Sequence, residues 1–301
     1  MTELGVVALF DVAESVHQAV DKILDITEFS VDSNVPIIIK PNLCAIKSPE
    51  TGATTDPIVV EALIDSIRKK FNASDFFIAE SNATMLNADL AFRLLGYYEL
   101  AHRTGARIVN LSSMRSRYQS FPQNFFLRKL KIPELFWKPH VLISVGKLKT
   151  HGLCGFSGTL KNLYGCNPEP YKVKYHVRLH HAIADIASVF KADFSVIDSI
   201  IAMEGEGGPV SGIPVRLNKI IAGKDPVSVD ACIARMIGID PEEIEYVKLS
   251  QKAEVGSAAY ELVCQGPQCL PLKLPNSVTE KLVSHTSNLV QLIRRNKRSA
   301  F

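Results

Sequence analysis

The sequence lacks the patterns that mark several common classes of protein. None of its apolar runs reaches the roughly 18 residues that a membrane-spanning helix requires. Its first ten residues, MTELGVVALF, have no basic region ahead of a long apolar core, as a signal peptide would. The 34 basic and 31 acidic residues nearly balance, so charge alone does not indicate nucleic acid. We therefore expect a cytoplasmic protein that has no membrane partner.

Motifs for nucleotide cofactors and clustered cysteines are absent as well. No G-x-G-x-x-G follows the first apolar run, and no G-x-x-x-x-G-K-[ST] occurs in the sequence. The glycine-rich stretch EGEGGP at 204–209 carries two carboxylates, which would repel phosphate. The six cysteines contain no C-x-x-C pair and are too scattered for a disulfide framework, which indicates reduced thiols.

The chain alternates short apolar runs with amphipathic segments. PIIIK at 36–40 and VLISV at 141–145 are typical of buried parallel strands. Asp-Pro pairs at 56–57, 225–226 and 240–241 indicate helix starts, because aspartate caps a helix and proline suits its first turn. The alternation predicts an α/β fold with a mostly parallel sheet flanked by helices.

The domain organisation follows from the same pattern. We expect residues 1–270 to form the α/β domain, either as one unit or as two lobes that meet near residue 140. Residues 88–105 predict one helix, and residues 112–131 predict a hairpin at the sheet edge. Residues 271–301 predict a C-terminal helix followed by a basic tail.

Polar residues follow several of the predicted strands. In doubly wound sheets such residues converge, because ligands bind outside the carboxyl ends of the strands. Lys40 and Asn42 follow PIIIK, and Glu204 begins the glycine-rich stretch. The densest cluster follows VLISV and comprises Lys147, Lys149, His151, Lys161 and Asn162. Cations this close repel each other, so the cluster predicts a site for a small anionic metabolite.

These residue types favour acid–base chemistry. His151 is the candidate general acid or base, because its ordinary pKa is near neutral and the neighbouring lysines favour its neutral form. Lys161 is a candidate base, nucleophile or anion contact, and Glu204 is a second acid–base or orienting group. The residues that would hold the substrate are Lys40, Asn42, Lys147, Lys149 and Asn162. We predict an enzyme that abstracts a proton next to a carboxylate, as a racemase, lyase or isomerase does.

Each of these assignments has a structural alternative. Lys40 can be a lysine that reaches from the end of a buried strand to water, and Asn42 can be a turn residue. His151 can cap its own loop, and Lys161 can be a solvated surface side chain. The sequence alone leaves these alternatives open.

Histidines near residue 180 suggest a divalent metal. His176 and His180 are four residues apart and would share one face of a helix, where both can ligate a metal. No third ligand lies nearby in the sequence. A pair between His181 and Asp185 that fixes the ring tautomer is the alternative.

Three cysteines fall in the candidate loops. Cys44 lies just past Asn42, and Cys154 and Cys166 flank Lys161. Together they can hold an iron–sulfur cluster with one open iron, which would serve redox or dehydration chemistry with a separate redox partner. The alternative is that these residues are small buried apolar side chains.

A nucleic-acid-binding module is the remaining alternative. Five basic residues lie from Arg115 to Lys131, and the chain ends in RRNKRSAF. A solvated surface is the commoner explanation of such runs, so we do not expect nucleic acid as a partner.

Several short motifs together resemble the family called domain of unknown function 362 (DUF362). They are KPN at 40–42, TTDP at 54–57, KLKTH at 147–151, TLKNLYGC at 159–166, the histidines at 176–181, EGEGGP at 204–209 and DPVSVDA at 225–231. The motifs occur in the family's order over roughly residues 35–239. Members of that family often carry an appended ferredoxin-like segment with closely spaced cysteines, which this sequence does not show.

More remotely, the lysines, histidines and glycines are similar in arrangement to those of the nickel-pincer lactate racemase group. That resemblance implies a cofactor-bearing lysine between two α/β domains. It implies that Lys161 is this lysine, and that His151 and either His176 or His180 lie near the metal.

Overall fold

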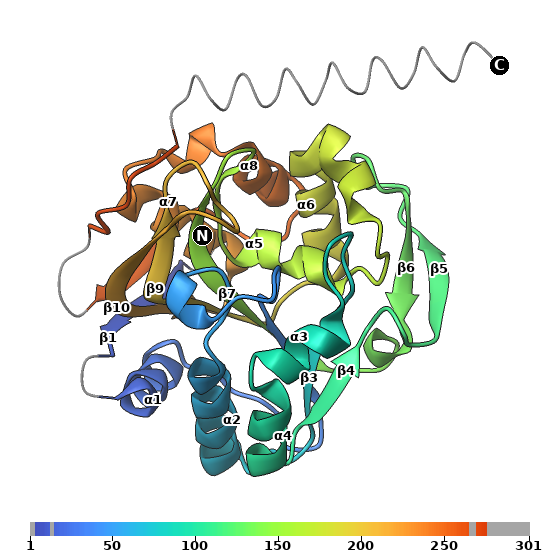
Figure 1. Cartoon of the computed structure of the whole chain (residues 1–301), viewed down its shortest axis with the longest axis vertical. Helices are drawn as coiled ribbons and strands as arrows, with labels where there is room; N and C mark the ends of the chain where they lie inside the picture. The colour runs from blue at the N-terminus through green and yellow to red at the C-terminus, as the bar shows by residue number, and fades with distance from the viewer. Residues whose placement is uncertain (1–3, 13–14, 265–268, 276–301) are drawn as a thin grey trace.

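The computed structural model describes residues 4–12, 15–264 and 269–275, and it confirms the predicted α/β class. A mostly parallel sheet lies between two layers of helices (Figure 1). The predicted C-terminal helix and basic tail fall mostly at 276–301, outside the described residues. Residues 271–275 contain neither helix nor strand.

The main sheet has nine strands in the order β11-β1-β10-β9-β7-β2-β3-β4, with β8 paired to β7. Their bounds are β1 Gly5–Asp11, β2 Ile37–Pro41, β3 Phe76–Glu80, β4 Arg107–Asn110, β7 Val141–His151, β8 Gly155–Ser157, β9 Phe194–Glu204, β10 Ile213–Gly223 and β11 Tyr260–Cys264. The strands from β9 to β4 are parallel, whereas β10 runs antiparallel to both of its neighbours. The sheet continues across residue 140, because β7 pairs with β2 on one side and with β9 on the other.

The hairpin expected at 112–131 is present as β5 (Ser116–Ser120) and β6 (Lys129–Pro133). It forms a two-stranded sheet of its own at one side of the molecule (Figure 1). The prediction of a hairpin was therefore right, but the hairpin does not extend the main sheet.

Helices cover the two faces of the sheet (Figure 1). One layer contains α1 (Val16–Ile26), α2 (Pro57–Phe71), α3 (Ala88–Leu94) and α4 (Tyr97–Thr104). The other contains α5 (Thr159–Asn162), α6 (Leu179–Val189), α7 (Pro226–Met236) and α8 (Glu245–Lys252). Short 3-10 turns complete the fold: η1 Pro49–Thr51, η2 Glu134–Phe136, η3 Leu163–Cys166, η4 Lys172–Arg178 and η5 Pro241–Glu243. Each helix layer buries its own apolar cluster against the sheet.

The helix starts agree with the predictions at two of the three Asp-Pro pairs. Asp56 and Asp225 accept hydrogen bonds from backbone N–H groups in the first turns of α2 and α7. At the third pair, Asp240 caps only the 3-10 turn η5, and α8 starts later, at Glu245. Residues 88–105 form two helices instead of one, because the chain turns at Gly96, whose left-handed φ of 79° favours glycine.

Strand β7 extends beyond its predicted end. The apolar run stops at Val145, but the strand continues to His151. Val145 packs into the layer that contains α1 to α4, and Leu148 packs into the opposite layer. Alternation along the strand places Lys147 and Lys149 on the same side as Val145, where both are buried. Charged residues can continue a buried strand when the protein supplies their polar partners.

Candidate functional site

Two lysine–carboxylate pairs are buried at the carboxyl ends of the central parallel strands. Lys40 Nζ lies 2.7 Å from Glu80 Oε2, and Lys147 Nζ lies 2.8 Å from Asp198 Oδ2. All four side chains are at most 6% exposed. The sequence suggested that an external anion offsets these lysines, but the protein supplies the counter-ions itself. Glu80 and Asp198 both stand at or near strand ends in the sequence, yet nothing there reveals their lysine partners.

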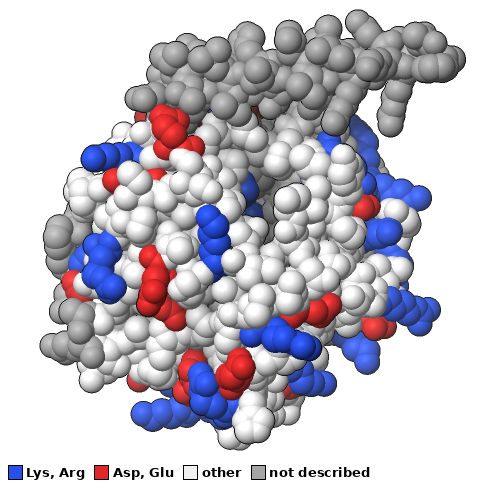
Figure 2. All heavy atoms as spheres, in the orientation of Figure 1, with Lys and Arg blue, Asp and Glu red and all other residues white. Residues whose placement is uncertain are grey.

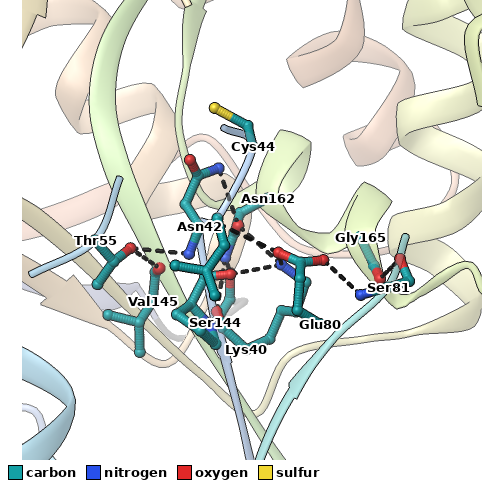
Figure 3. Close-up of polar contacts among 12 residues, drawn as sticks. Lys40, Asn42, Cys44, Thr55, Glu80, Ser81, Ser144, Val145, Asn162 and Gly165 are labelled. Atoms are coloured by element: carbon teal, nitrogen blue, oxygen red, sulfur yellow. Dashed lines mark hydrogen bonds and ion pairs between the residues drawn. The ribbon is translucent and has the colours of Figure 1, made fainter. Parts of the chain in front are cut away.

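Asn42 and Asn162 connect Lys40 of the first pair to Lys149, and Figure 3 shows the contacts that involve Lys40. The Asn162 amide donates to the Lys40 carbonyl oxygen over 2.9 Å and to Ser144 Oγ over 3.1 Å. Its oxygen accepts from the Asn42 amide over 3.2 Å, and the Asn42 oxygen accepts from Lys149 Nζ over 2.8 Å. Both side chains are therefore engaged within the protein. They position the lysines, and the substrate contact that the sequence suggested for them stays a prediction.

Lys149 is buried without a carboxylate among the partners found in the described chain. Its Nζ donates to Asn42 Oδ1 and to the Ala53 carbonyl oxygen, each over 2.8 Å, and lies 3.1 Å from Cys44 Sγ. Burial lowers the pKa of Lys149, and its interaction with Cys44 partly opposes this shift. The predicted substrate lysine is thus surrounded by protein groups, and one of them is a thiol.

A fourth buried lysine was missed by the sequence reasoning. Lys172 Nζ donates to Ser81 Oγ and, over 2.8 Å, to the Asn82 carbonyl oxygen. Burial lowers the pKa of Lys172 to about 8, although Glu80 acts in the opposite direction. Lys172 lies in a polar stretch with no strand before it, so no local pattern distinguishes it from a surface lysine.

Glycine allows the chain to pack directly on the first ion pair. At Gly165 a Cβ would lie 2.6 Å from Lys40 Nζ and 2.5 Å from Glu80 Oε1. The Gly165 carbonyl oxygen also accepts a hydrogen bond from Ser81 Oγ (Figure 3). Turn η3 therefore covers the pair, which keeps water away from it.

A buried carboxylate fixes the short helix that carries Lys161. Asp230, on α7, accepts hydrogen bonds from the backbone N–H groups of Thr159 over 2.7 Å and Leu160 over 3.1 Å. Burial raises the pKa of Asp230 to about 7, against the lowering effect of these two amides. At Gly158 a Cβ would collide with the Asp230 carboxylate. Asp230 was not among the predicted site residues, although the family motif DPVSVDA contains it.

Lys161 differs from the other lysines of the site. It is half-buried, and within the described chain its side chain has no hydrogen bond or ion pair. Its charge lowers the pKa values of Lys149, His151 and His176, so all of these groups lie within electrostatic reach of it. The result is a positively charged region in which no carboxylate of the described residues pairs with the Lys161 ammonium.

His151 is neutral, and one hydrogen bond fixes its tautomer. It is only 6% exposed, and burial, followed by the charges of Lys161 and Lys149, holds its pKa well below 6.5. The Leu153 backbone N–H donates to His151 Nδ1 over 3.1 Å, so the ring proton of the neutral form lies on Nε2. His151 can therefore donate a hydrogen bond from Nε2, whereas its basic nitrogen is already occupied.

The two predicted metal histidines lie on different elements. His176 is exposed in η4, and His180 is half-buried in α6, where it stacks on Tyr246 at a centroid distance of 6.1 Å. The pKa values of both are lowered, chiefly by desolvation of their rings. His180 Nδ1 is buried and lacks a hydrogen-bond partner among the described residues.

The structure does not assemble a metal site from these side chains. Among the described residues, no three His, Cys, Asp or Glu side chains are grouped closely enough to hold a metal ion. Cys154 packs in the apolar core, and Cys166 lies fully buried beneath the first ion pair, where burial raises its pKa to about 12. A thiol in this state is a poor source of the thiolate that a cluster requires. The protein side chains alone therefore do not fit an iron–sulfur cluster or a divalent metal.

Two further predicted groups have structural partners. Glu204 is buried, and its Oε2 accepts a hydrogen bond from the Lys273 backbone N–H over 2.7 Å. Asp185, predicted as a partner of His181, instead accepts three backbone hydrogen bonds from residues 125–127. The prediction of a His181–Asp185 pair was therefore wrong, since the Asp185 carboxylate anchors the loop between β5 and β6.

Comparison with known proteins identifies the family. The profile of the family described as Domain of unknown function (DUF362) matches residues 37–235, and the chain belongs to that family. The resemblance drawn from the sequence motifs is confirmed by this match.

Two proteins illustrate its relatives. The chain is 26% identical over 233 residues to a thylakoid-associated protein of Synechocystis sp. (strain ATCC 27184 / PCC 6803 / Kazusa), which covers 75% of this chain and 70% of that protein. The lactate racemase apoprotein from Thermoanaerobacterium thermosaccharolyticum superposes with a TM-score of 0.47 and 17% identity, over 72% of this chain. This chain spans 54% of the length of that solved structure. Within the described residues, no helix is long and apolar enough to cross a membrane.

Proposed function

We propose that this member of the DUF362 family is an enzyme that binds a small anionic metabolite beside Lys161 and transfers a proton next to its carboxylate. A racemase, lyase or isomerase performs such a step. The observation that carries the proposal is the half-buried ammonium of Lys161, which has no ion pair among the described residues and has neutral imidazoles within electrostatic reach. An anionic ligand would supply the missing negative charge.

Each site residue has a defined role in this proposal. Lys161 holds the carboxylate of the ligand. His151 donates its Nε2–H to the oxygen on which charge develops as the adjacent carbon loses its proton, because its Nδ1 already accepts from Leu153. A neutral imidazole is suited to this task, since it stabilises negative charge without itself being ionised.

The proton acceptor is the second requirement. His176 and His180 have lowered pKa values, so both rings are neutral at pH 7 and can accept a proton. His180 Nδ1 is buried and has no hydrogen-bond partner in the described chain, so the proposal assigns the proton-accepting lone pair to this nitrogen. The proposal gives His151 the donor role and a histidine of the η4–α6 segment the role of base.

Ligand binding tests the site directly. We would titrate the protein with oxalate and with inorganic phosphate by isothermal calorimetry, using wild type, Lys161→Gln and the control Lys69→Gln. Lys69 is exposed near the end of α2, on the opposite side of the sheet from α5. We expect Lys161→Gln to weaken anion binding at least tenfold and Lys69→Gln to leave it unchanged. Equal binding by all three proteins would refute the site.

Proton transfer needs a separate measurement. We would incubate the protein in D₂O with a panel of 2-hydroxy and 2-amino acids and follow loss of the Cα proton by NMR. His151→Gln should abolish any exchange that wild type shows, while the variant keeps its fold by circular dichroism. Exchange that survives this substitution would remove His151 from the mechanism.

Iron–sulfur chemistry has less support. The three cysteines proposed as cluster ligands lie in unsuitable surroundings. Cys44 contacts Lys149, and Cys154 packs in the apolar core. Burial raises the pKa of Cys166 to about 12. The acid–base proposal requires no rearrangement of these side chains, whereas the cluster proposal does.

A further inference from the structure

The hairpin β5–β6 carries a concentration of positive charge that the site above does not use. Residues 112–133 contain five basic residues and no aspartate or glutamate. Figure 2 shows lysine and arginine side chains gathered along the side of the molecule where Figure 1 places β5 and β6. Such a surface attracts anions from solution.

A pocket lies between this hairpin and the segment that follows η3. Its volume is about 410 Å³, which falls within the range of small-molecule sites. Its lining combines two tyrosines with three lysines and one glutamate: Tyr118, Tyr175, Lys129, Lys131, Lys174 and Glu169. Leu130 and Asn167 complete the walls. The pocket shares no residue with the Lys161 site.

The lysines of the pocket are organised around aromatic rings. Lys129 Nζ and Lys131 Nζ lie 5.0 and 5.4 Å from the centroid of the same ring, that of Tyr118. Lys174 Nζ lies 5.0 Å from the centroid of the Tyr175 ring and pairs with Glu169 over 3.0 Å. Neither Lys129 nor Lys131 has an ion pair within 4.0 Å in the described chain. The ring of Tyr118 thus lies near two ammonium groups that have no ion pair in the described chain, although the charge of Lys131 reaches Glu169 and helps to lower its pKa.

Two features of the lining define the ligand. Two lysines on one wall favour an anionic group with several oxygens, such as a phosphate. Tyr118 is 59% exposed, so a planar ring can stack on the part of its aromatic surface that Lys129 and Lys131 leave open. A ligand that satisfies both features carries a phosphate and an aromatic ring close together.

We propose that this pocket binds a nucleotide, with the phosphate between Lys129 and Lys131 and the base stacked on Tyr118. A free mononucleotide and a single-stranded RNA present the same chemistry to the pocket. Stacking on tyrosine and contact with lysine accept any base, so we expect binding with little sequence preference.

The test compares ligands that contain one or both of the required groups. Wild-type protein is titrated by calorimetry with adenosine 5′-monophosphate, adenosine and ribose 5-phosphate. We expect adenosine 5′-monophosphate to bind at least tenfold more tightly than either fragment. Equal binding of ribose 5-phosphate would overturn the stacking part of the proposal, and absence of binding at millimolar concentration would overturn the whole.

Variants then locate the binding. Tyr118→Leu should weaken binding of adenosine 5′-monophosphate about tenfold. Lys131→Gln should also weaken it and should reduce the slope of log affinity against log salt by about one for a pentanucleotide RNA. The matched control is Lys138→Gln, an exposed lysine outside the pocket. Unchanged affinity in both pocket variants would refute the assignment.

The source of the nucleotide is read from the same titrations. A pentanucleotide RNA that binds more tightly than adenosine 5′-monophosphate, and loses this gain in Tyr118→Leu, supports a strand as ligand. Equal affinities support a free nucleotide. All variants concern exposed or half-buried side chains, two in the hairpin and the control Lys138 after η2, and circular dichroism checks that each remains folded.

Discussion

Lys147 Nζ lies 2.8 Å from Asp198 Oδ2, and both side chains are at most 1% exposed. The same Asp198 oxygen accepts the backbone N–H of Asp56 over 2.8 Å, and the other oxygen accepts the N–H of Ile200 over 3.0 Å. This carboxylate therefore joins β7, β9 and the start of α2. A buried ion pair of this kind gives a fold little net stability, but removal of one partner leaves an unpaired charge in the interior.

Breaking the pair should destabilise the protein strongly. We expect Lys147→Met to lower the free energy of unfolding by about 3–5 kcal/mol, because Asp198 is left charged and buried. Urea unfolding followed by circular dichroism measures the change. The control is Asp25→Asn, which breaks an exposed pair with Lys70 and should cost less than about 1 kcal/mol. Equal effects from the two substitutions would contradict this account.

Substitution of Gly158 should affect both stability and the site. In Gly158→Ala the new methyl group would meet the Asp230 carboxylate, which must move away from the amides at the start of α5. We expect a loss of roughly 1–3 kcal/mol in the free energy of unfolding and weaker oxalate binding, since α5 carries Lys161. Gly152→Ala is the matched control, because its methyl group would have no atom within 4 Å. Normal oxalate binding by Gly158→Ala would show that the position of α5 does not affect the site.

The neutral state of His151 predicts a dependence of stability on pH. In the unfolded chain the ring takes up a proton as the pH falls below 6.5, whereas the folded ring, with its lowered pKa, does not. The unfolded state then binds more protons, so the free energy of unfolding decreases as the pH falls below 6.5, by up to about 1.4 kcal/mol per pH unit for this group.

Unfolding curves from pH 7 to pH 5 check this sign. We expect His151→Gln to show a shallower loss of stability on the acid side than wild type, with His176 and His180 contributing the part that remains. An equally steep loss in the variant would show that His151 is protonated in the folded protein.

The raised pKa of Asp230 predicts the opposite dependence of stability on pH. Its folded pKa of about 7 lies above its ordinary value of 3.8, so the folded state binds the proton more tightly. The contribution of this group to stability is complete below pH 3.8 and is lost as the pH rises through 7. The difference in unfolding free energy between wild type and Asp230→Asn should therefore decrease from pH 4 to pH 7.5 in urea titrations. A difference that stays constant over this range would contradict the assignment.

The sequence predicted the layers of the fold better than it predicted the roles within the site. Strands such as PIIIK and helix starts such as Asp56-Pro57 depend on neighbours in sequence, and the structure confirms them. The end of β7 depends on Asp198, about 50 residues away, so the change from apolar to charged residues at Lys147 resembled a strand end.

In the site as well, features set by sequence neighbours were predicted and features set by tertiary contacts were not. The sequence placed the polar residues at strand ends, but it could not distinguish lysines with internal counter-ions from lysines without a carboxylate partner in the described chain. Lys40 lies at a strand end and Lys161 in a polar stretch, and only tertiary contacts pair Lys40 with Glu80 while leaving Lys161 without a carboxylate among the described residues. Likewise the tautomer of His151 rests on one backbone N–H, which no residue pattern encodes.

The continuation of β7 past its apolar run restricts how the gene can change in length. Lys147 and Lys149 reach their partners because an odd–even alternation of side chains carries through from Val145. An insertion of one codon between Val145 and Lys147 would turn both ammonium groups toward the layer that now holds Leu148, and would bring Leu148 to the place of Lys149, beside Asn42 and Ala53. Two inserted codons would restore the facing of each side chain, but they would displace both lysines by roughly 7 Å along the strand from Asp198 and Asn42. The number of residues between Val145 and Lys147 is therefore fixed by these buried contacts.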